Sequence, residues 1–215
     1  MITIYHLDRS RSERAVWLME ELSAAYEIEH FDRTATWEAA PDYKTLHPLG
    51  SSPVISVDGK VIAESGAVIE YLATTVGSGV LALSPGHSRY ADYLYWFHFA
   101  ECTLMNILTS EIMSERAGVD EQHASRIYNR RRRDELLAFV DDHLASNRFI
   151  AGDDFTAADI MITFPFTTTR AFAPFKIDAY PNIVAYLARI RSRPAYRRGQ
   201  HIAGPNRDRT ESQDE

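Results

Sequence analysis

The chain has 215 residues, of which 45% are hydrophobic, and a formal net charge of −7. That length and apolar content allow either one large domain or two small domains with substantial cores, and we expect two. The acidic balance argues against general binding of nucleic acid or of an anionic membrane surface, and no apolar run approaches the roughly 18 residues that suggest a membrane span.

The N-terminus, MITIYHLDRS, has neither the basic region nor the hydrophobic core of a secretory signal, so we expect a cytoplasmic protein. The single cysteine, Cys102, excludes an intrachain disulfide and a metal site made of four cysteines. Because Cys102 lies within an apolar pattern of helical period, we expect a small buried side chain there rather than a reactive thiol.

The first 30 residues predict a β-α-β unit. Ile2, Ile4 and Tyr5 indicate a short strand, residues 14–22 carry apolar side chains at helical spacing, and residues 26–30 alternate as in a second strand. A crossover helix between two strands implies that they run parallel. Residues 34–46, which follow, are irregular to weakly helical.

The stretch HPLGSSPVISVDGKVIAES, residues 47–65, predicts a turn followed by a β-hairpin. Its prolines and its first glycine exclude a continuous helix at the start. β-forming residues then flank Asp58-Gly59, which is a signal for a two-residue hairpin turn. Glu64-Ser65 closes the hairpin, and the apolar residues within 67–72 recur as in a helix of about three turns.

Residues 78–87 are rich in small and helix-breaking residues and predict a linker between a domain of residues 1–77 and a domain of residues 88–203. No strand-hairpin signal recurs after the linker, so the second domain should be all-α. Its expected helices cover residues 88–117, 121–145, 156–172 and 181–191. The tail, residues 204–215, is polar and without periodicity, and we expect it to be disordered.

Thr156 and Asp159 have the spacing of a helix capping box, with Phe155 and Ile160 at the positions of a hydrophobic staple. Capping alone explains a hydroxyl and a carboxylate at this spacing. We therefore assign both residues to folding rather than to chemistry.

The Glu64-Ser65 pair has the groups that a zwitterionic amino-acid head requires. Ser65 at a helix N-terminus offers a hydroxyl and unsatisfied backbone N–H groups to a carboxylate, and Glu64 can pair with an ammonium group. Each of these residues, and Pro53 before them, also has a purely structural explanation. Ser65 is compatible with an ordinary N-cap, Glu64 with a favourable charge near the helix dipole, and Pro53 with a trans peptide bond.

The order of proline loop, hairpin, Glu-Ser pair and helix resembles the glutathione-binding half of the glutathione S-transferase family. The resemblance extends to about residue 200 and includes the capping box, which follows a glycine-aspartate turn at Gly152-Asp153. It implies a thioredoxin-like N-terminal domain of order βαβ-α-ββα, an all-helical C-terminal domain, a cis bond before Pro53, glutathione as co-substrate and a homodimer. The loop DRSRSER lacks the Cys-x-x-Cys of dithiol exchange, which excludes that redox chemistry.

Within the family the chain resembles the serine-type branch, such as the theta class, and the match implies that Ser10 contacts the glutathione sulfur. Ser12 is the competitor for this role, and Tyr5 is the alternative if the site is of the tyrosine type. A hydroxyl that donates to the charged sulfur is worth about 1.5–3 kcal/mol, and a helix N-terminus adds about 0.3–1 kcal/mol. Lowering the thiol pKa by two units requires roughly 2.7 kcal/mol, so no general base is needed.

The resemblance also assigns the rest of the tripeptide. Ser52, beside Pro53, would exchange backbone hydrogen bonds with the cysteinyl part in the manner of a strand, and Glu64 and Ser65 would take the γ-glutamyl end.

The glycyl carboxylate requires a cation, for which Lys44, His47 and Arg11 are the candidates. His47 is the best placed of the three because it directly precedes Pro48.

The electrophile is expected between the first domain and the first long helix of the second domain, which runs from Tyr90 to Glu115. Its stretch YWFHFAECTLMNIL resembles a motif of bacterial family members, in which we expect a glycine where Cys102 stands. That difference either narrows the second-substrate pocket or is neutral packing. Side chains on several faces of this helix are Tyr95, Trp96, His98, Phe99, Glu101, Met105 and Asn106.

The leading functional hypothesis is conjugation of the glutathione thiolate to a small hydrophobic electrophile. One alternative is a non-catalytic binding or interaction module on the same fold. Another is a glutathione-dependent isomerase, dehalogenase or peroxidase, which would differ in the electrophile pocket rather than in the thiol site.

Overall fold

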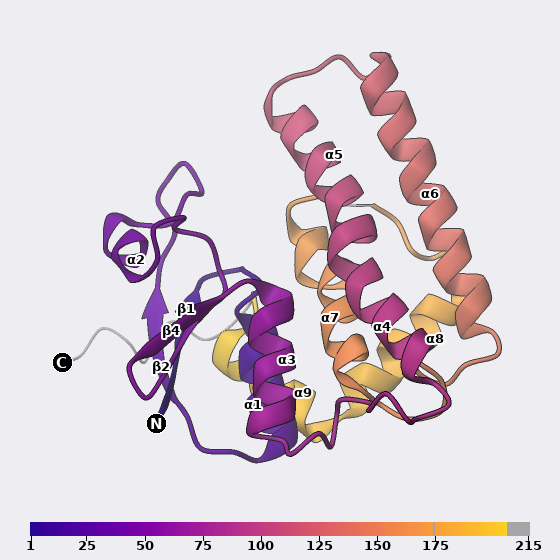
Figure 1. Cartoon of the computed structure of the whole chain (residues 1–215). Coiled ribbons are helices and arrows are strands. Elements are labelled where there is room, and N and C mark those ends of the chain that lie inside the picture. Colours follow the sequence, from indigo (N-terminus) through magenta and orange to yellow (C-terminus); the bar gives the residue numbers. More distant parts are fainter. Residues whose placement is uncertain (174, 206–215) are drawn as a thin grey trace. The chain divides into compact units, whose positions relative to one another are not determined.

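The computed structural model describes residues 1–173 and 175–205 (Figure 1). The chain divides into two compact units, one formed by Met1–Ala82 together with the described chain from Arg191 onward, the other by Leu83–Ile190. The second unit is therefore shorter than the expected domain of residues 88–203, because the last described helix belongs to the first unit. Of the tail expected to be disordered, residues 206–215 lie outside the described part of the chain.

The first unit contains a four-stranded mixed sheet in the order β2-β1-β3-β4. Its strands are β1 (Ile2–Leu7), β2 (Glu27–Phe31), β3 (Val54–Val57) and β4 (Lys60–Ala63). β1 pairs parallel with β2 and antiparallel with β3, and β3 pairs antiparallel with β4. Asp58 and Gly59 connect β3 to β4 with φ angles of 49° and 81°, as the tightest hairpin turns require. The predicted β-α-β unit and the predicted hairpin are both confirmed.

Four helices accompany this sheet: α1 (Glu13–Leu22), α2 (Pro41–Leu46), α3 (Ser65–Thr75) and α9 (Pro194–Ala203). Helix α9 was not expected from the sequence, and it packs against α1 (Figure 1). Gly199 allows the two helices to approach closely, since a Cβ atom at this position would lie 3.1 Å from the Cα of Trp17. The guanidinium of Arg193 donates from Nε and Nη2 to the two carboxylate oxygens of Glu21, at 2.7 and 2.8 Å. Helix α9 is thereby fastened to the crossover helix.

The second unit is built from helices, as predicted. They are α4 (Tyr90–His98), a π-helical segment (Phe99–Met105), α5 (Asn106–Arg116), α6 (Ala124–Leu144), α7 (Ala157–Phe166), a short 3₁₀ helix (Thr168–Ala171) and α8 (Pro181–Ser192). α5 and α6 lie side by side (Figure 1). No helix in the described ranges combines the length and the apolar character needed to cross a membrane.

Two of the expected helices are interrupted. The helix expected over residues 88–117 consists of α4 and α5 with a wider π-helical turn between them. The helix expected over residues 156–172 ends at Phe166, where Thr167 takes φ −117° and ψ −93° and leaves the helical region. Pro165, in the last turn of α7, cannot donate a backbone hydrogen bond, which weakens the helix at this point.

The predicted capping box at the start of α7 is confirmed. Asp159 is fully buried and accepts hydrogen bonds from the backbone N–H of Ile150 and of Thr156, both at 2.8 Å, and from the hydroxyl of Tyr186 at 3.0 Å. Burial raises the pKa of the Asp159 carboxyl to about 6, against the opposing effect of these donors. Asp159 therefore joins three segments of the helical unit through one carboxylate.

Candidate active site

The loop after β1 places two serines in the interior of the first unit. Ser10 is 4% exposed and Ser12 is fully buried, just before α1 begins at Glu13. The Oγ of Ser10 lies 2.7 Å from the Oγ of Ser52 and 2.8 Å from the Oγ of Ser12. The fold thus brings together Ser10 and Ser52, which are 42 residues apart in the chain.

The peptide bond between Ser52 and Pro53 is cis, as expected. Tyr43, which is fully buried on α2, hydrogen-bonds with the side chain of Ser52. Burial raises the pKa of the Tyr43 hydroxyl, whereas the hydrogen bond to Ser52 opposes that rise, so this hydroxyl stays neutral. Tyr5 packs against the core cluster that includes Tyr43, with its ring edge toward that of Phe31.

The Glu64-Ser65 corner lies at the start of α3. The helix begins at Ser65, and Glu64 occupies the capping position with a φ angle of 76° and without a capping hydrogen bond from its side chain. Ser65 is therefore the first helical residue and not the N-cap. Ser65 is buried and Glu64 is exposed. The first turn of a helix has backbone N–H groups that suit a carboxylate, and the neighbouring Glu64 suits an ammonium group.

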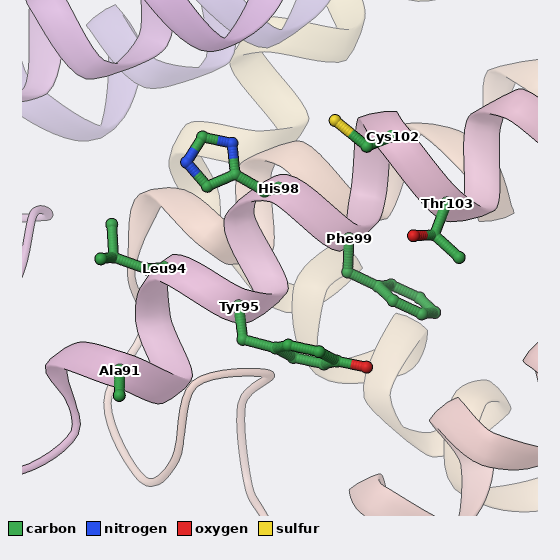
Figure 2. A pocket seen from close by; sticks show the side chains of 7 residues that line it. All are labelled: Ala91, Leu94, Tyr95, His98, Phe99, Cys102 and Thr103. Carbon is green, nitrogen blue, oxygen red and sulfur yellow. The ribbon is translucent and has the colours of Figure 1, made fainter.

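A pocket of about 520 Å³ lies on α4 and the π-helical segment of the second unit (Figure 2). Its lining residues recur every three to four positions and so form one stripe along the helix. They are Ala91, Leu94, Tyr95, His98, Phe99, Cys102 and Thr103. Most of this lining is apolar, as a site for a hydrophobic molecule requires.

Three of the side chains considered from the sequence line this pocket: Tyr95, His98 and Phe99. The ring of Tyr95 stacks on that of Phe99 with centroids 5.8 Å apart, and Figure 2 shows His98 and Cys102 projecting away from these two rings. In contrast, Trp96 and Met105 are 2% and 4% exposed and belong to the core. Glu101 and Asn106 are not among the lining residues.

The expectation that Cys102 is buried is wrong, since its side chain is exposed in the pocket. The π-helical segment provides the physical reason. A π-helical turn contains more residues than an α-helical turn, so the residues within it leave the face that an α-helical pattern assigns to them.

Comparison with known proteins agrees with this architecture. Residues 1–74 match the family model described as glutathione S-transferase, N-terminal domain, and residues 102–194 match the model of the C-terminal domain. Glutathione S-transferase 3 of Schizosaccharomyces pombe is 34% identical over 210 residues, which cover 92% of this chain and 86% of the relative. The chain belongs to the glutathione S-transferase family.

Solved structures of other glutathione S-transferases share the fold. A glutathione S-transferase from Actinobacillus pleuropneumoniae superimposes with a TM-score of 0.86 at 27% identity, over 96% of this chain and 95% of that one. A theta class glutathione S-transferase from Xanthomonas axonopodis pv. citri, solved with glutathione bound, gives a TM-score of 0.73 at 26% identity, over 92% and 96% of the two chains. The thioredoxin-like first domain and the helical second domain are therefore confirmed.

Two residues that contact the candidate site or its loop were not identified from the sequence. Arg33 donates from Nε to the carbonyl of Asp8 and from Nη1 to the carbonyl of Trp37, both at 2.8 Å, and so holds the loop that leads to Ser10. His6, fully buried on β1, has its Nδ1 2.9 Å from the Oγ of Ser12. Neither a lone arginine in an irregular segment nor a lone histidine in a strand has a spacing signal that would identify it.

The three cations considered for the glycyl carboxylate lie on two segments. Lys44 belongs to α2 and forms an exposed, and therefore weak, ion pair with Glu38 at 3.3 Å. His47 caps the end of the same helix, and its Nδ1 accepts a hydrogen bond from the backbone N–H of Leu49 at 3.4 Å. Arg11 belongs instead to the Ser10 loop and is half-buried.

Proposed function

We propose that this family member is a serine-type glutathione transferase, which conjugates the thiolate of glutathione to a small hydrophobic electrophile. The observation that carries the proposal is the position of the Ser10 hydroxyl, 2.7 Å from Ser52 and next to the cis bond before Pro53. A buried hydroxyl at this place can donate a hydrogen bond to a sulfur held beside Ser52. Such a bond favours the ionised thiol.

Glutathione is the co-substrate in this proposal, and the chain has a group suited to each of its parts. The backbone of Ser52 would pair with the cysteinyl residue in the manner of an added strand. Ser65, at the N-terminus of α3, and Glu64 would hold the carboxylate and the ammonium group of the γ-glutamyl end. His47 would face the glycyl carboxylate.

The pocket on α4 is our candidate site for the electrophile. Its apolar lining favours hydrophobic molecules, and Cys102 is one of the lining residues. We further propose that the enzyme is a homodimer and acts in the cytoplasm, as the family resemblance implies.

Binding of glutathione tests the proposal directly. The protein should be retained on immobilised glutathione, and glutathione at 100 times its dissociation constant should stabilise it by about 2.7 kcal/mol. For a chain of this size, that free energy raises the Tm by roughly 5–10 °C. The Tm should be measured by calorimetry in millimolar glutathione.

The matched control ligand is cysteinyl-glycine, which lacks the γ-glutamyl group and should give a much smaller rise. In a Glu64→Gln variant the difference between the two ligands should become smaller, because the variant has lost the charge that faces the ammonium group but keeps Ser65 for the carboxylate. If glutathione leaves the Tm unchanged at millimolar concentration, the non-catalytic binding module becomes the better explanation of the fold.

Filling the pocket on α4 should affect only the second substrate. Cys102→Trp places a large side chain at an exposed lining position, and we expect kcat/KM for a bulky hydrophobic electrophile to fall by about tenfold or more. The affinity for glutathione should not change. Steady-state kinetics with electrophiles of increasing size would measure the effect.

Met113→Trp is the matched control, because Met113 is 50% exposed on α5 and does not line the pocket. Equal losses in the two variants would contradict the assignment of the pocket to the electrophile. The oligomeric state of both variants should be followed by light scattering. Loss of a dimer in Cys102→Trp alone would identify this face of α4 as a subunit contact instead.

A further inference from the structure

A chain of hydrogen bonds extends from β1 to the candidate sulfur site. The Nδ1 of His6 lies 2.9 Å from the Oγ of Ser12, which lies 2.8 Å from the Oγ of Ser10, which lies 2.7 Å from the Oγ of Ser52. His6 and Ser12 are fully buried. The hydroxyl proposed to meet the sulfur is therefore connected to an imidazole in the interior.

Each serine hydroxyl has one hydrogen to donate, which limits the hydrogen-bond patterns that this chain can adopt. If Nδ1 of His6 accepts from Ser12, then Ser10 must donate to Ser12. In that direction the hydrogen of Ser10 is occupied, and no hydrogen remains for a thiolate.

The opposite direction leaves Ser10 competent. If Nδ1 of His6 carries a hydrogen, it donates to Ser12, and the hydrogen of Ser12 is free to be donated to Ser10. The hydrogen of Ser10 then points toward Ser52 and the sulfur beside it.

Two further contacts affect the direction in which the serine hydroxyls donate their hydrogens. The backbone N–H of Ser12 donates to the Oγ of Ser10 at 3.3 Å, so the Ser10 oxygen already acts as an acceptor on this side. The carbonyl of Leu7 lies 3.4 Å from the Oγ of Ser12 and is a competing acceptor for the Ser12 hydrogen. A hydrogen on Nδ1 of His6 does not remove this competition, but it occupies one acceptor position of the Ser12 oxygen and so disfavours donation from Ser10 to Ser12.

We propose that His6 is a positioning residue, whose Nδ1–H sets the direction of the serine chain and so leaves the Ser10 hydrogen available to the glutathione sulfur. This inference rests on the proposed function. His6 would act through Ser12 and would not touch the substrate.

The test is the pKa of the glutathione thiol in the enzyme complex, followed by the ultraviolet absorbance of the thiolate. His6→Phe keeps a ring but removes the donor, and we expect the thiol pKa to rise by about 0.5–1 unit, less than in Ser10→Ala. His6→Asn restores an N–H near the position of Nδ1 and should return the pKa toward the wild-type value. The dissociation constant of glutathione should change little in either variant.

His30→Phe is the matched control. His30 pairs with His6 across β1 and β2, with ring centroids 5.4 Å apart, but it is exposed and is not part of the serine chain. The thiol pKa should not change in this variant.

A double-mutant cycle separates positioning from a general structural effect. In a Ser12→Ala background, Ser10 has lost the Ser12 hydroxyl as an acceptor, so adding His6→Phe should leave the thiol pKa unchanged. A shift of the same size in both backgrounds would overturn the proposal.

A measurement on the unmodified enzyme covers the case in which His6→Phe does not fold. The ¹⁵N spectrum of histidine-labelled enzyme in complex with glutathione, assigned with His6→Asn, should show a hydrogen on Nδ1 of His6. A bare Nδ1 would overturn the proposal. If His6→Phe leaves the thiol pKa unchanged while Ser10→Ala raises it, the role of His6 is contradicted but the role of Ser10 is not. If Ser10→Ala also leaves the thiol pKa unchanged, the role of Ser10 in the proposed function is contradicted as well.

Discussion

Replacing Ser10 by alanine is expected to raise the pKa of the enzyme-bound glutathione thiol by about one to two units. The reason is the loss of a hydrogen bond worth about 1.5–3 kcal/mol to the charged sulfur, since one pKa unit corresponds to 1.36 kcal/mol. The thiol pKa can be read from the ultraviolet titration of the complex.

The same change predicts a particular pH dependence of the rate. At a pH near the wild-type thiol pKa, the thiolate fraction in Ser10→Ala falls by roughly 5–50-fold, and kcat/KM should fall in proportion. Above both pKa values the thiol is ionised in both enzymes, so the difference should become smaller as the pH rises. Ser51→Ala, an exposed serine one residue from Ser52, is the control and should behave as wild type. An unchanged thiol titration in Ser10→Ala would remove Ser10 from its proposed role and leave Ser12 as the next candidate.

Replacing Asp159 by alanine is expected to lower the free energy of unfolding by about 3–5 kcal/mol, because it leaves several buried donors without an acceptor. These donors are the backbone N–H groups of Ile150 and Thr156 and the hydroxyl of Tyr186. Urea denaturation at neutral pH would measure the loss. Asp154→Ala is the matched control, since Asp154 is exposed close by and its loss should change the stability by less than about 0.5 kcal/mol.

Asp159 should also make the stability depend on pH. Its carboxyl has a pKa of about 6 in the folded protein against 3.8 as the ordinary value, so between these values the unfolded chain has released a proton that the folded chain retains. Stability therefore falls as the pH rises through this window, by about 3 kcal/mol in all, and the loss is complete above pH 6. Asp159→Asn cannot ionise and should lack this contribution. A constant difference between wild type and Asp159→Asn from pH 4 to pH 7 would contradict the assignment.

The features that were predicted correctly depend on neighbours in the sequence. Asp58-Gly59 specifies its turn through the backbone conformations that these two residues tolerate, and Thr156 with Asp159 specifies a helix start through contacts three residues apart. Such signals are complete within a few residues, so they do not depend on the rest of the fold.

The features that were missed depend on distant partners. Helix α9 has few large apolar side chains, since Ala195, Gly199 and Ala203 are three of its four buried residues, and its partner α1 lies near the other end of the chain. The hydrogen-bond contact between His6 and Ser12 forms only in the folded chain, so the sequence gives no signal for it. The exposure of Cys102 follows from a π-helical segment that the residue pattern did not indicate.

The packing of α9 against α1 has a consequence for the order in which the parts of the chain fold during synthesis. On the ribosome, the strands around Ser10 and Pro53 emerge early, but the helix that covers Trp17 is translated after the whole helical unit. The half that is proposed to bind glutathione is thus the first to be synthesised and the last to be completed, and a nascent chain stopped before Pro194 would keep the Trp17 side of α1 uncovered.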